Sequence, residues 1–426
     1  MIDVPRTLAP TTGIATRYSL LPPQPDNPLW STAVALNPIE GWDETNTPLS
    51  ALVAGANGHS RADALLRGAG EAVERRALHP DDHLPVVHGT ATELGTNAFQ
   101  AHAHALAHPD AATTSLAWYP ALRLSDSSTV LVPAGLVDWP TTAPAALFDP
   151  SPSGAASGGS RDMALRSALV EIVERDAFTT AWGRQLRLPS HTDPIRAVAE
   201  APDHPTGEAL RTLWRRALDQ GIEATFAHIP TAVPGLWCVV ACLIDPRGTT
   251  RPGANAMATV GMKASDRPHD ALLGALQEAW QVRAALEATR RDGPVHAPDP
   301  VVTEHDRIRY MLTAGAYTAV RDWVAGFTPA QAPMTERKVS TDDIVTAVLA
   351  DGADPLVVDL TPRLPATTRA MGWQAVKVVP AGYQHLRMDE THDWTWHLPR
   401  LTTAPERTGC PARLTDHRSA APHPLP

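Results

Sequence analysis

Two stretches of this chain, about a hundred residues apart, carry nearly the same acidic pattern. The first, GEAVERRAL, contains Glu71 and Glu74, and the second, VEIVERDAF, contains Glu171 and Glu174. In each stretch an arginine follows the second glutamate. Positions i, i+3 and i+4 of a helix share one face, so both carboxylates and the neighbouring arginine can point at one object. The recurrence therefore predicts two similar helices with a shared task.

A third helix-like stretch, ALQEAWQVRAALE, repeats the layout with Glu278, Gln281 and Arg283. Clustered acids beside arginines such as Arg75 and Arg175 indicate a site for hard cations that bridge an anionic ligand. Mg²⁺ takes about six oxygen ligands and usually combines one or two carboxylates with substrate phosphates, which arginines also bind. The alternative is an ordinary solvated helix face, and the near-identical recurrence argues against it.

The composition indicates a folded, soluble globular protein: of 426 residues, 43% are hydrophobic and 19% are charged. A net charge of −10 argues against a nucleic-acid binder. The start, MIDVPRTLAP, lacks a secretory pattern, and the longest apolar run, 237–244, is too short for a membrane span. Three cysteines make no disulfide framework. We expect a cytoplasmic, enzyme-sized protein that contacts neither nucleic acid nor membrane.

Hydrophobic patterning predicts many strands and a few long helices. Strand-like segments with β-branched or aromatic residues cover 32–36, 115–122, 129–132, 222–229, 236–244, 256–263, 356–360 and 375–379. Helical periodicity covers 62–78, 161–182, 207–220, 269–287, 304–314 and 342–350. Because strands and helices do not alternate strictly, the pattern favours an α+β fold with mixed or antiparallel sheets.

Two loops rich in small residues, GANGHS at 55–60 and SPSGAASGGS at 151–160, are expected to precede the first two acidic helices. A flexible loop that leads into a helix is a natural place for backbone N–H groups to meet phosphate. No GxxxxGK[ST] or GxGxxG motif is present, so any nucleotide site must be of a less common kind.

The last 16 residues, 411–426, are polar and rich in proline, and Pro422, Pro424 and Pro426 occupy alternate positions. Such a run favours an extended or polyproline conformation. A frayed tail is the simplest interpretation, because chain ends are often poorly ordered.

Taken together, these motifs resemble the YcaO superfamily. The resemblance covers TTGIATR near the N-terminus, the acidic stretches within 64–75, 153–182 and 271–283, and the late segments VVDLTP and VKVVPAG. It implies a YcaO domain over residues 1–410, with an N-terminal part to about 145 and a core from about 146, followed by the proline-rich tail 411–426.

Members of this family bind ATP and Mg²⁺ without a P-loop, through acidic helices. Carried over by motif, the metal-facing residues would be Glu71, Glu74, Glu171, Glu174 and Glu278. The residues near phosphate or nucleotide would be Ser153, Arg75, Arg175, Gln281 and Arg283. Which glutamate binds which ion stays open. The first glycine segment departs from the family, with Asn57 where a lysine is common.

The family activates a backbone amide: a nucleophile attacks the carbonyl, ATP phosphorylates the oxygen, and loss of phosphate completes the dehydration. With Cys, Ser or Thr of a ribosomally made peptide as nucleophile, the product is a thiazoline or oxazoline. Azoline-forming members resemble this chain in a P-x-P-x-P ending that reaches toward the active site, which favours a cyclodehydratase with Pro422, Pro424 and Pro426 at the reaction centre. A thioamide- or amidine-forming enzyme and a catalytically idle partner protein are the alternatives.

The resemblance also implies partners. The YcaO region begins almost at the first residue, so we expect a separate protein resembling ThiF or ubiquitin-activating enzymes to capture the leader of the precursor peptide. A flavin-dependent dehydrogenase that oxidises azolines is an optional further partner, and a homodimer is expected because the family often dimerises.

Overall fold

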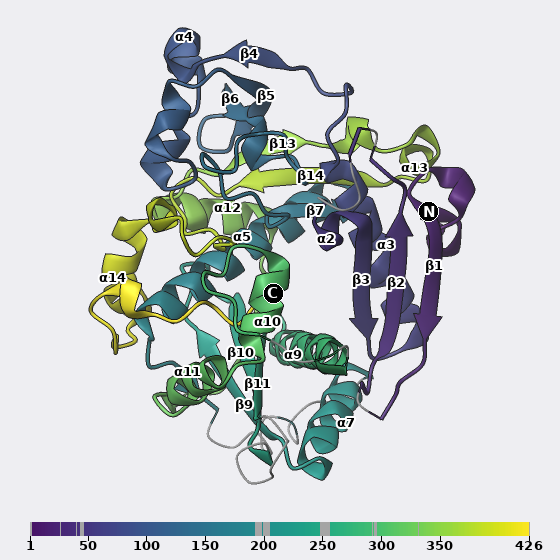
Figure 1. Ribbon diagram of the computed structural model, residues 1–426, viewed down its shortest axis with the longest axis vertical. Helices are drawn as coiled ribbons and strands as arrows, with labels where there is room; N and C mark the ends of the chain where they lie inside the picture. Colours follow the sequence, from purple (N-terminus) through teal and green to yellow (C-terminus); the bar gives the residue numbers. More distant parts are fainter. Residues whose placement is uncertain are drawn as a thin grey trace.

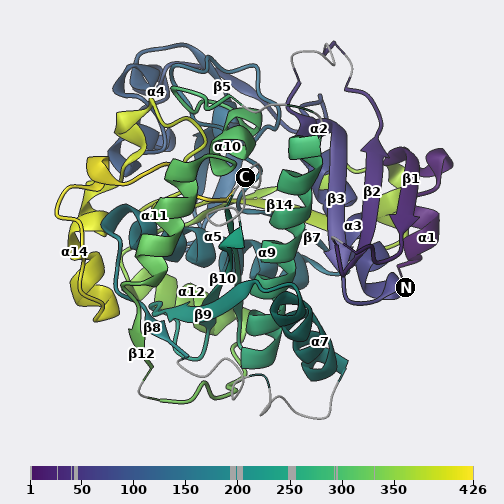
Figure 2. The same cartoon turned by 60° about the horizontal axis from the view of Figure 1, so that its bottom comes forward.

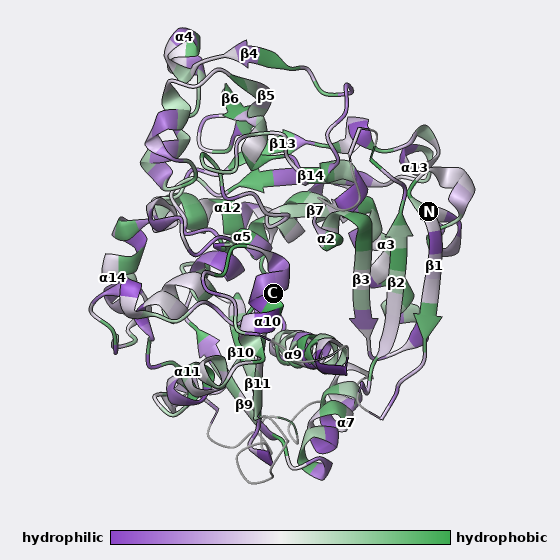
Figure 3. Cartoon of the chain, viewed as in Figure 1, coloured by the Kyte–Doolittle hydropathy of each residue, from purple (hydrophilic) through white to green (hydrophobic). Residues whose placement is uncertain are grey.

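The computed structural model describes residues 2–25, 27–39, 41–42, 47–191, 198, 205–247, 256–291, 293, 296–330 and 332–425. Within these residues, three β-sheets with helices packed between and around them give the predicted α+β fold (Figure 1). Among the described residues, no helix is both long enough and apolar enough to cross a bilayer. In Figure 3, β3, β13 and β14 carry mainly hydrophobic colours, whereas α10 is hydrophilic.

The first sheet is antiparallel, in the order β1–β2–β3, and lies at one side of the molecule (Figures 1 and 2). Its strands are β1 (Ala15–Leu21), β2 (Trp30–Leu36) and β3 (Val53–Gly58). β3 leads into α3 (Arg61–Leu78), which carries the first acidic stretch and packs on β2 and β3.

The second sheet has the order β11–β10–β9–β8–β12, with β11 at its edge. The strands are β8 (Pro189–Ser190), β9 (Glu223–Ile229), β10 (Trp237–Asp245), β11 (Met257–Ser265) and β12 (Thr328–Pro329). Alternate residues of β10 enter different cores: Cys238, Val240 and Cys242 pack with α5 (Arg161–Arg184). Val239 and its alternates pack with α7 (Pro205–Asp219) and α9 (Pro268–Arg291). Both faces of β10 are therefore buried.

The third sheet has the order β4–β5–β13–β14–β7, with β6 paired to β5. The strands are β4 (Val87–Gly89), β5 (Leu116–Arg123), β6 (Thr129–Pro133), β7 (Ala155–Gly158), β13 (Leu356–Asp359) and β14 (Gln374–Val379). β7 leads into α5, as β3 leads into α3. α5, which carries the second acidic stretch, is buried along most of its length between the second and third sheets. The expected division near residue 145 stays a prediction.

The expectation of loops at 55–60 and 151–160 is only partly correct, because residues 55–58 belong to β3 and residues 155–158 form β7, whereas residues 151–154 are irregular. The small residues serve close packing. A Cβ on Gly58 would lie 2.7 Å from Asp63 Oδ2, and a Cβ on Gly158 would lie 3.0 Å from the backbone N of Ala164. Each strand thus runs against the first turn of the helix that follows it.

The predicted helix 304–314 is also corrected. It ends early, as α10 (Glu304–Met311), and a helix that was not predicted, α11 (Ala314–Val324), begins after Thr313. The Thr313 side chain accepts a hydrogen bond from the N–H of Ala316, and such a cap starts a new helix. The remaining late helices are α12 (Thr341–Ala350), α13 (Ala366–Ala370) and α14 (Leu398–Thr408).

Candidate functional site

The two acidic stretches meet where α3 and α5 face each other beside β7 and β14. The Glu171 charge on α5 raises the pKa of Glu71 and of Glu74 on α3, so the two helices lie within electrostatic reach. α9 joins them from the second sheet, since the charge of Glu174 raises the pKa of Glu278. All five predicted metal-facing glutamates therefore belong to one cluster, which we call the acidic cluster.

On α3 the arginine of the motif pairs with both glutamates of its own helix. Arg75 donates to Glu74 at 2.6 Å and to Glu71 at 3.4 Å, and all three side chains are half-buried. The start of this helix is fixed by Ser60, whose hydroxyl accepts a hydrogen bond from the N–H of Asp63.

On α5 the same motif is tied to the edge strand β11. Arg175 reaches Glu171 at 3.4 Å and the sulfur of Met262 at 3.5 Å. The buried Glu174 accepts the N–H of Ala264 at 2.5 Å. Glu278 of α9 accepts the N–H of Met262 at 2.6 Å. β11 thus uses alternate backbone N–H groups to hold two carboxylates of the acidic cluster.

Burial disfavours the fully ionised form of the acidic cluster. It raises the pKa of Glu71 and Glu174, raises that of Glu74 to about 8, and raises that of Glu278 to about 7. Repulsion from neighbouring carboxylates acts in the same direction. A divalent cation would relieve both effects, because it binds the ionised form.

Two buried donors in the cluster have no hydrogen-bond partner within the described residues, namely the Nε–H groups of Arg75 and Arg175. Unpaired buried donors are costly and favour an anionic ligand. No three acidic, histidine or cysteine side chains among the residues the structure describes enclose a metal ion by themselves. Mg²⁺ takes only one or two carboxylates from a protein and completes its shell with phosphate oxygens and water, so neighbouring glutamates beside arginine donors fit this ion.

Lys377 of β14 is a member of the site that the sequence did not single out. Its ammonium donates to the carbonyls of Ser151 at 2.8 Å and Ser153 at 2.7 Å, so it holds the segment before β7. Burial lowers its pKa to about 8, while the charges of Glu171 and Glu74 act in the opposite direction. The signal in the sequence was a lysine inside the otherwise apolar strand VKVV.

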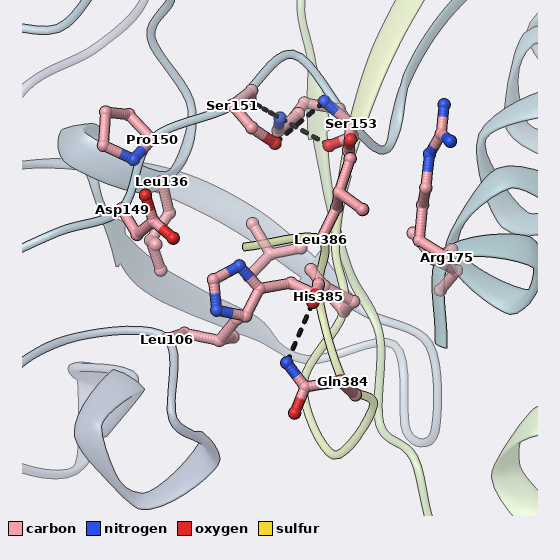
Figure 4. A pocket seen from close by; sticks show the side chains of 14 residues that line it. Leu106, Leu136, Asp149, Pro150, Ser151, Ser153, Arg175, Gln384, His385 and Leu386 are labelled. Atoms are coloured by element: carbon pink, nitrogen blue, oxygen red, sulfur yellow. Dashed lines mark hydrogen bonds between the residues drawn. The ribbon is translucent and has the colours of Figure 1, made fainter. Parts of the chain in front are cut away.

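A small pocket of about 40 Å³ opens beside Arg175 (Figure 4). Arg175 extends along one side, Ser151 and Ser153 lie at the top of the view, and Gln384 and His385 lie below. A volume of this size holds only a few waters, since one water needs roughly 10–15 Å³. The predicted Ser153 is thus beside Arg175, in a space for a small polar group.

A larger pocket of about 400 Å³ lies at the beginnings of α3, α5 and α9. Its size falls in the range of small-ligand pockets, roughly 300–1,000 Å³. Its charged lining residues are Asp63, Arg67, Arg166, Lys263, Arg267 and Asp270, and His59 lines it as well. Lys263 connects it to the acidic cluster, because its positive charge lowers the pKa of Glu174 and Glu278.

The two predicted phosphate-side residues of α9 have different surroundings. Gln281 donates to the carbonyl of Gly55 at 3.3 Å and so links α9 to β3. Arg283 is not brought to the acidic cluster: it is buried and pairs with Asp245 at 2.8 Å and Glu287 at 3.4 Å. Five positions after Glu278 lie about 140° around a helix, which explains the separation.

The proline-rich tail is packed against the protein through residue 425. Pro424 and Leu425 are buried, Pro422 is half-buried, and Pro426 lies outside the described residues. Burial lowers the pKa of His423 well below its usual value, and the charge of Arg175 adds to this shift. The tail therefore comes within electrostatic reach of Arg175. Figures 1 and 2 place the end of the tail near the middle of the molecule, next to α10.

Solved structures with the same fold are heterocyclases and their relatives. A heterocyclase in complex with substrate and cofactor matches 99% of this chain and 56% of its own, with 18% identity and a TM-score of 0.72. YcaO from Methanopyrus kandleri, bound with AMPPCP and Mg²⁺, covers 89% of this chain and 88% of its own, with 19% identity and a TM-score of 0.61. The E. coli microcin synthetase McbBCD complex covers 86% and 88%, with 15% identity and a TM-score of 0.61.

Among curated proteins, an uncharacterized protein of Methanothermobacter thermautotrophicus is 30% identical over 183 residues. The chain spans 44% of that relative and 56% of the heterocyclase above. The profile described as YcaO cyclodehydratase, ATP- and Mg²⁺-binding, matches residues 55–384, which include the acidic cluster and the larger pocket. With the fold, the acids and the unpaired arginine donors in agreement, the chain belongs to the YcaO family, whose cofactors are ATP and Mg²⁺.

Proposed function

We propose that this protein is an ATP- and Mg²⁺-dependent cyclodehydratase that converts Cys, Ser or Thr of a ribosomally made precursor peptide to thiazoline or oxazoline. The observation that carries the proposal is the path of the tail: residues 421–425 follow α5 toward Arg175, beside the acidic cluster. A proline-rich ending of this kind, packed toward the site, favours azoline formation over the alternatives.

When bound, Mg²⁺ would neutralise the carboxylates and ATP would supply the phosphoryl group that activates the amide oxygen. Glu71, Glu74, Glu171, Glu174 and Glu278 are the residues we assign to holding the cations. Arg75 and Arg175, whose Nε–H groups have no partner among the residues that the structure describes, would donate to the anion. The work of the chain is to position groups and to compensate charge, as in phosphoryl transfer generally.

The two pockets suit different parts of the reaction. The larger one at the helix beginnings has the size and the cationic lining for the nucleoside and phosphates. The smaller one, between Arg175, Ser153 and Gln384, is suited to a small polar group such as the reacting amide and its water. Asp149 lines it, and burial raises the pKa of this carboxyl to about 7, which suits proton transfer near neutral pH. Pro422, Pro424 and Pro426 would delimit the reaction centre.

The proposal includes separate partners. A ThiF-like protein would bind the leader of the precursor peptide, and a flavin-dependent dehydrogenase would act on the azolines if they are oxidised. Among similar solved structures, the microcin synthetase also exists as a complex with pro-MccB17 bound. Cytoplasmic location and dimer formation belong to the proposal as well.

The test is intact-mass analysis. The protein, a ThiF-like protein and a Cys/Ser/Thr-rich precursor encoded beside its gene are incubated with ATP and Mg²⁺. We expect the peptide to lose the mass of one water for each heterocycle, with consumption of ATP. A peptide of unchanged mass, with ATP binding confirmed, would refute the assignment. The matched control replaces Glu174 with Gln and should leave the peptide unmodified.

The same experiment separates the second enzyme hypothesis. Exchange of a backbone oxygen for sulfur increases the mass of the peptide, so a thioamide product cannot be mistaken for an azoline. Deletion of 421–426 gives an independent criterion: azoline formation should fall sharply, whereas an unaffected rate would favour a thioamide- or amidine-forming enzyme or an idle partner.

A further inference from the structure

The tail poses a bonding problem because proline has no N–H group. Residues 421–425 read APHPL, so their carbonyls need donors while few donors are available for pairing with a sheet. Buried carbonyls without partners are unfavourable. Other parts of the molecule must therefore supply the N–H groups that hold this segment.

One side of the tail follows a single face of α5. The backbone of Arg413 and Leu414 bonds to carbonyls in the last turn of α5 and just beyond it. Further along, the indole N–H of Trp182 donates to the carbonyl of Ala421 at 2.7 Å, and Phe178 meets the His423 ring edge-on at 6.5 Å. Positions 182, 178 and 175 lie one above another on a helix, so the tail runs toward Arg175.

The other side of the tail is held by Arg307 of α10, whose side chain is fully buried. Its guanidinium donates to the carbonyl of His423 at 3.0 Å. It also donates to the carbonyls of Arg387 at 3.1 Å and Met388 at 2.9 Å, and to Glu390 at 2.9 Å. One side chain thus satisfies three backbone carbonyls and one carboxylate, which a lysine with its compact ammonium cannot reproduce.

The loop on the far side of Arg307 is itself fixed at the small pocket. The backbone N–H groups of Met388 and Asp389 donate to Asp149 at 2.8 and 3.0 Å, and Asp149 lines that pocket. Arg387 binds Glu390 at 2.6 Å, so the loop is closed on itself. Arg307 therefore joins the tail to a segment that has a defined position relative to the site.

The ring of His423 completes the connection. Nε2 lies 2.5 Å from the carbonyl of Arg387, so this nitrogen carries the proton and donates. Nδ1 lies 3.4 Å from the N–H of Leu425, so it accepts. Both nitrogens are occupied in the neutral ring. The positive charges that act on it come from Arg307 on α10, Arg387 in the loop and Arg175 on α5.

The position of α10 does not depend on the tail. Thr303 and Asp306 form a reciprocal cap at its start, and Glu304 accepts a hydrogen bond from Ser50 at 2.5 Å. Arg307 thus extends from a helix that is anchored elsewhere.

We propose that Arg307 is a positioning residue that sets where residues 423–425 lie relative to Arg175, and so controls the chemical step without touching nucleotide or peptide. The inference rests on the proposed function only for its kinetic consequence, because the placement of the tail can be measured without any reaction.

The structural test uses the chemical reactivity of a thiol introduced by Leu425→Cys. Leu425 is 2% exposed, and the native cysteines Cys238, Cys242 and Cys410 are all buried. Maleimide labelling of position 425 is compared with and without Arg307→Met. Because the substitution removes buried charge-assisted hydrogen bonds, we expect labelling to become roughly tenfold to hundredfold faster. Arg309→Met, on an exposed position of the same helix, is the control and should change nothing.

The kinetic test asks whether Arg307 acts through the tail. Arg307→Met should lower kcat for heterocycle formation and leave KM for ATP unchanged, and Arg307→Lys should restore little. In a chain that lacks 421–426, the same substitution should cost nothing further. An additional loss there, or labelling at the parent rate, would overturn the proposal.

The outcomes of the two tests remain separable. Faster labelling without any azoline product would uphold the role of Arg307 and refute the cyclodehydratase assignment. Azoline formation with unchanged labelling would support the cyclodehydratase assignment and refute the role of Arg307. If Arg307→Met does not fold, Arg307→Lys carries the labelling experiment, because its ammonium keeps the buried charge while it loses part of the hydrogen bonding.

Discussion

The units β3–α3 and β7–α5 have the same plan and different surroundings. In both, a strand of small residues ends in glycine, a serine caps the helix, and Glu-x-x-Glu-Arg follows ten or so residues later. α3 buries one side against the first sheet, whereas α5 is buried along most of its length. The shared pattern puts the charged side chains at equivalent helix positions, and the packing around each helix determines how tightly those side chains are fixed.

The difference is clearest in the second glutamate of each motif. Glu74 is half-buried and pairs with Arg75 on its own helix, whereas Glu174 is 5% exposed and bonds to the backbone of β11. The first motif can therefore adjust its side chains to a ligand, while the second is fixed by the fold. A site made of one adjustable and one fixed half can bind a cation and its anion without repacking the core.

The largest effect is expected when the acids are neutralised. Glu174→Gln and Glu74→Gln should each reduce Mg²⁺-dependent ATP turnover by about 100-fold or more, because we assign both halves to one charge-compensating site. The double variant should lose little beyond the worse single one, as expected for groups that act as a unit. Turnover assays with Glu208→Gln on α7 as the control check this. Full activity in either single variant would show that the two halves are independent.

The next effect distinguishes the two strand–helix joints. A Cβ at Gly58 would overlap the backbone of Ala64, while one at Gly158 would lie 3.0 Å from its nearest neighbours. Overpacking usually costs about 1–3 kcal/mol, and we expect Gly58→Ala near the upper end and Gly158→Ala near the lower. Urea unfolding measures both, with Gly55→Ala as the control because its Cβ would meet nothing within 4 Å. Equal costs would contradict the difference in packing.

The acidic cluster also predicts how stability depends on pH. The pKa values of Glu74 and Glu278 rise from 4.5 to about 8 and about 7 in the folded protein, so the folded state binds more protons than the unfolded chain. Without Mg²⁺, the contribution of these two carboxyls to stability should therefore fall as pH rises from 4.5 to 8. Mg²⁺ at about 100 times its Kd adds up to about 2.7 kcal/mol, most at the alkaline end, where it no longer competes with protons. Thermal melts of the parent protein and of a Glu74→Gln, Glu278→Gln double variant across this range test it, since the buried histidines affect both proteins alike. A difference in Tm between the two proteins that does not change with pH would be inconsistent.

The smallest effect concerns the serine caps. Ser60→Ala and Ser160→Ala should each cost about 1 kcal/mol, because each removes one acceptor from the first turn of its helix. The two losses should be nearly equal, since the cap geometry is the same although the helices differ in burial. Denaturant midpoints would show it, and a markedly larger loss for Ser160 would mean that this cap has an additional role.

The sequence predicted the acid-bearing helices well because their apolar stripes and acidic faces are both local signals. α3, α5 and α9 begin within one residue of the predicted starts. The acidic cluster followed from recurrence alone, and the family resemblance then named ATP and Mg²⁺. The α+β architecture was also predicted, and the observed sheets and the solved structures of the same fold confirm it.

The features that could not be predicted from the sequence depend on contacts between residues that lie far apart in the chain. GANG and AASG have the composition of loops and become strands because β2 and β14 pair with them. No spacing connects Lys377 to Glu74, and Arg307 in EHDRIRYM looks like any surface arginine until the loop at 387–390 and the tail cover it. Arg283 shows the opposite error, since a local pattern suggested a place that helix geometry forbids.

The edge position of β11 gives the glutamates a second consequence. An exposed edge strand offers unpaired N–H groups that can recruit another chain and start aggregation. Here the N–H groups of Met262 and Ala264, on the side away from β10, are taken by Glu278 and Glu174. The carboxylates that we assign to the cations thus also occupy the free edge of the second sheet. A sequence that keeps them for cation binding therefore also keeps this edge from pairing with another chain.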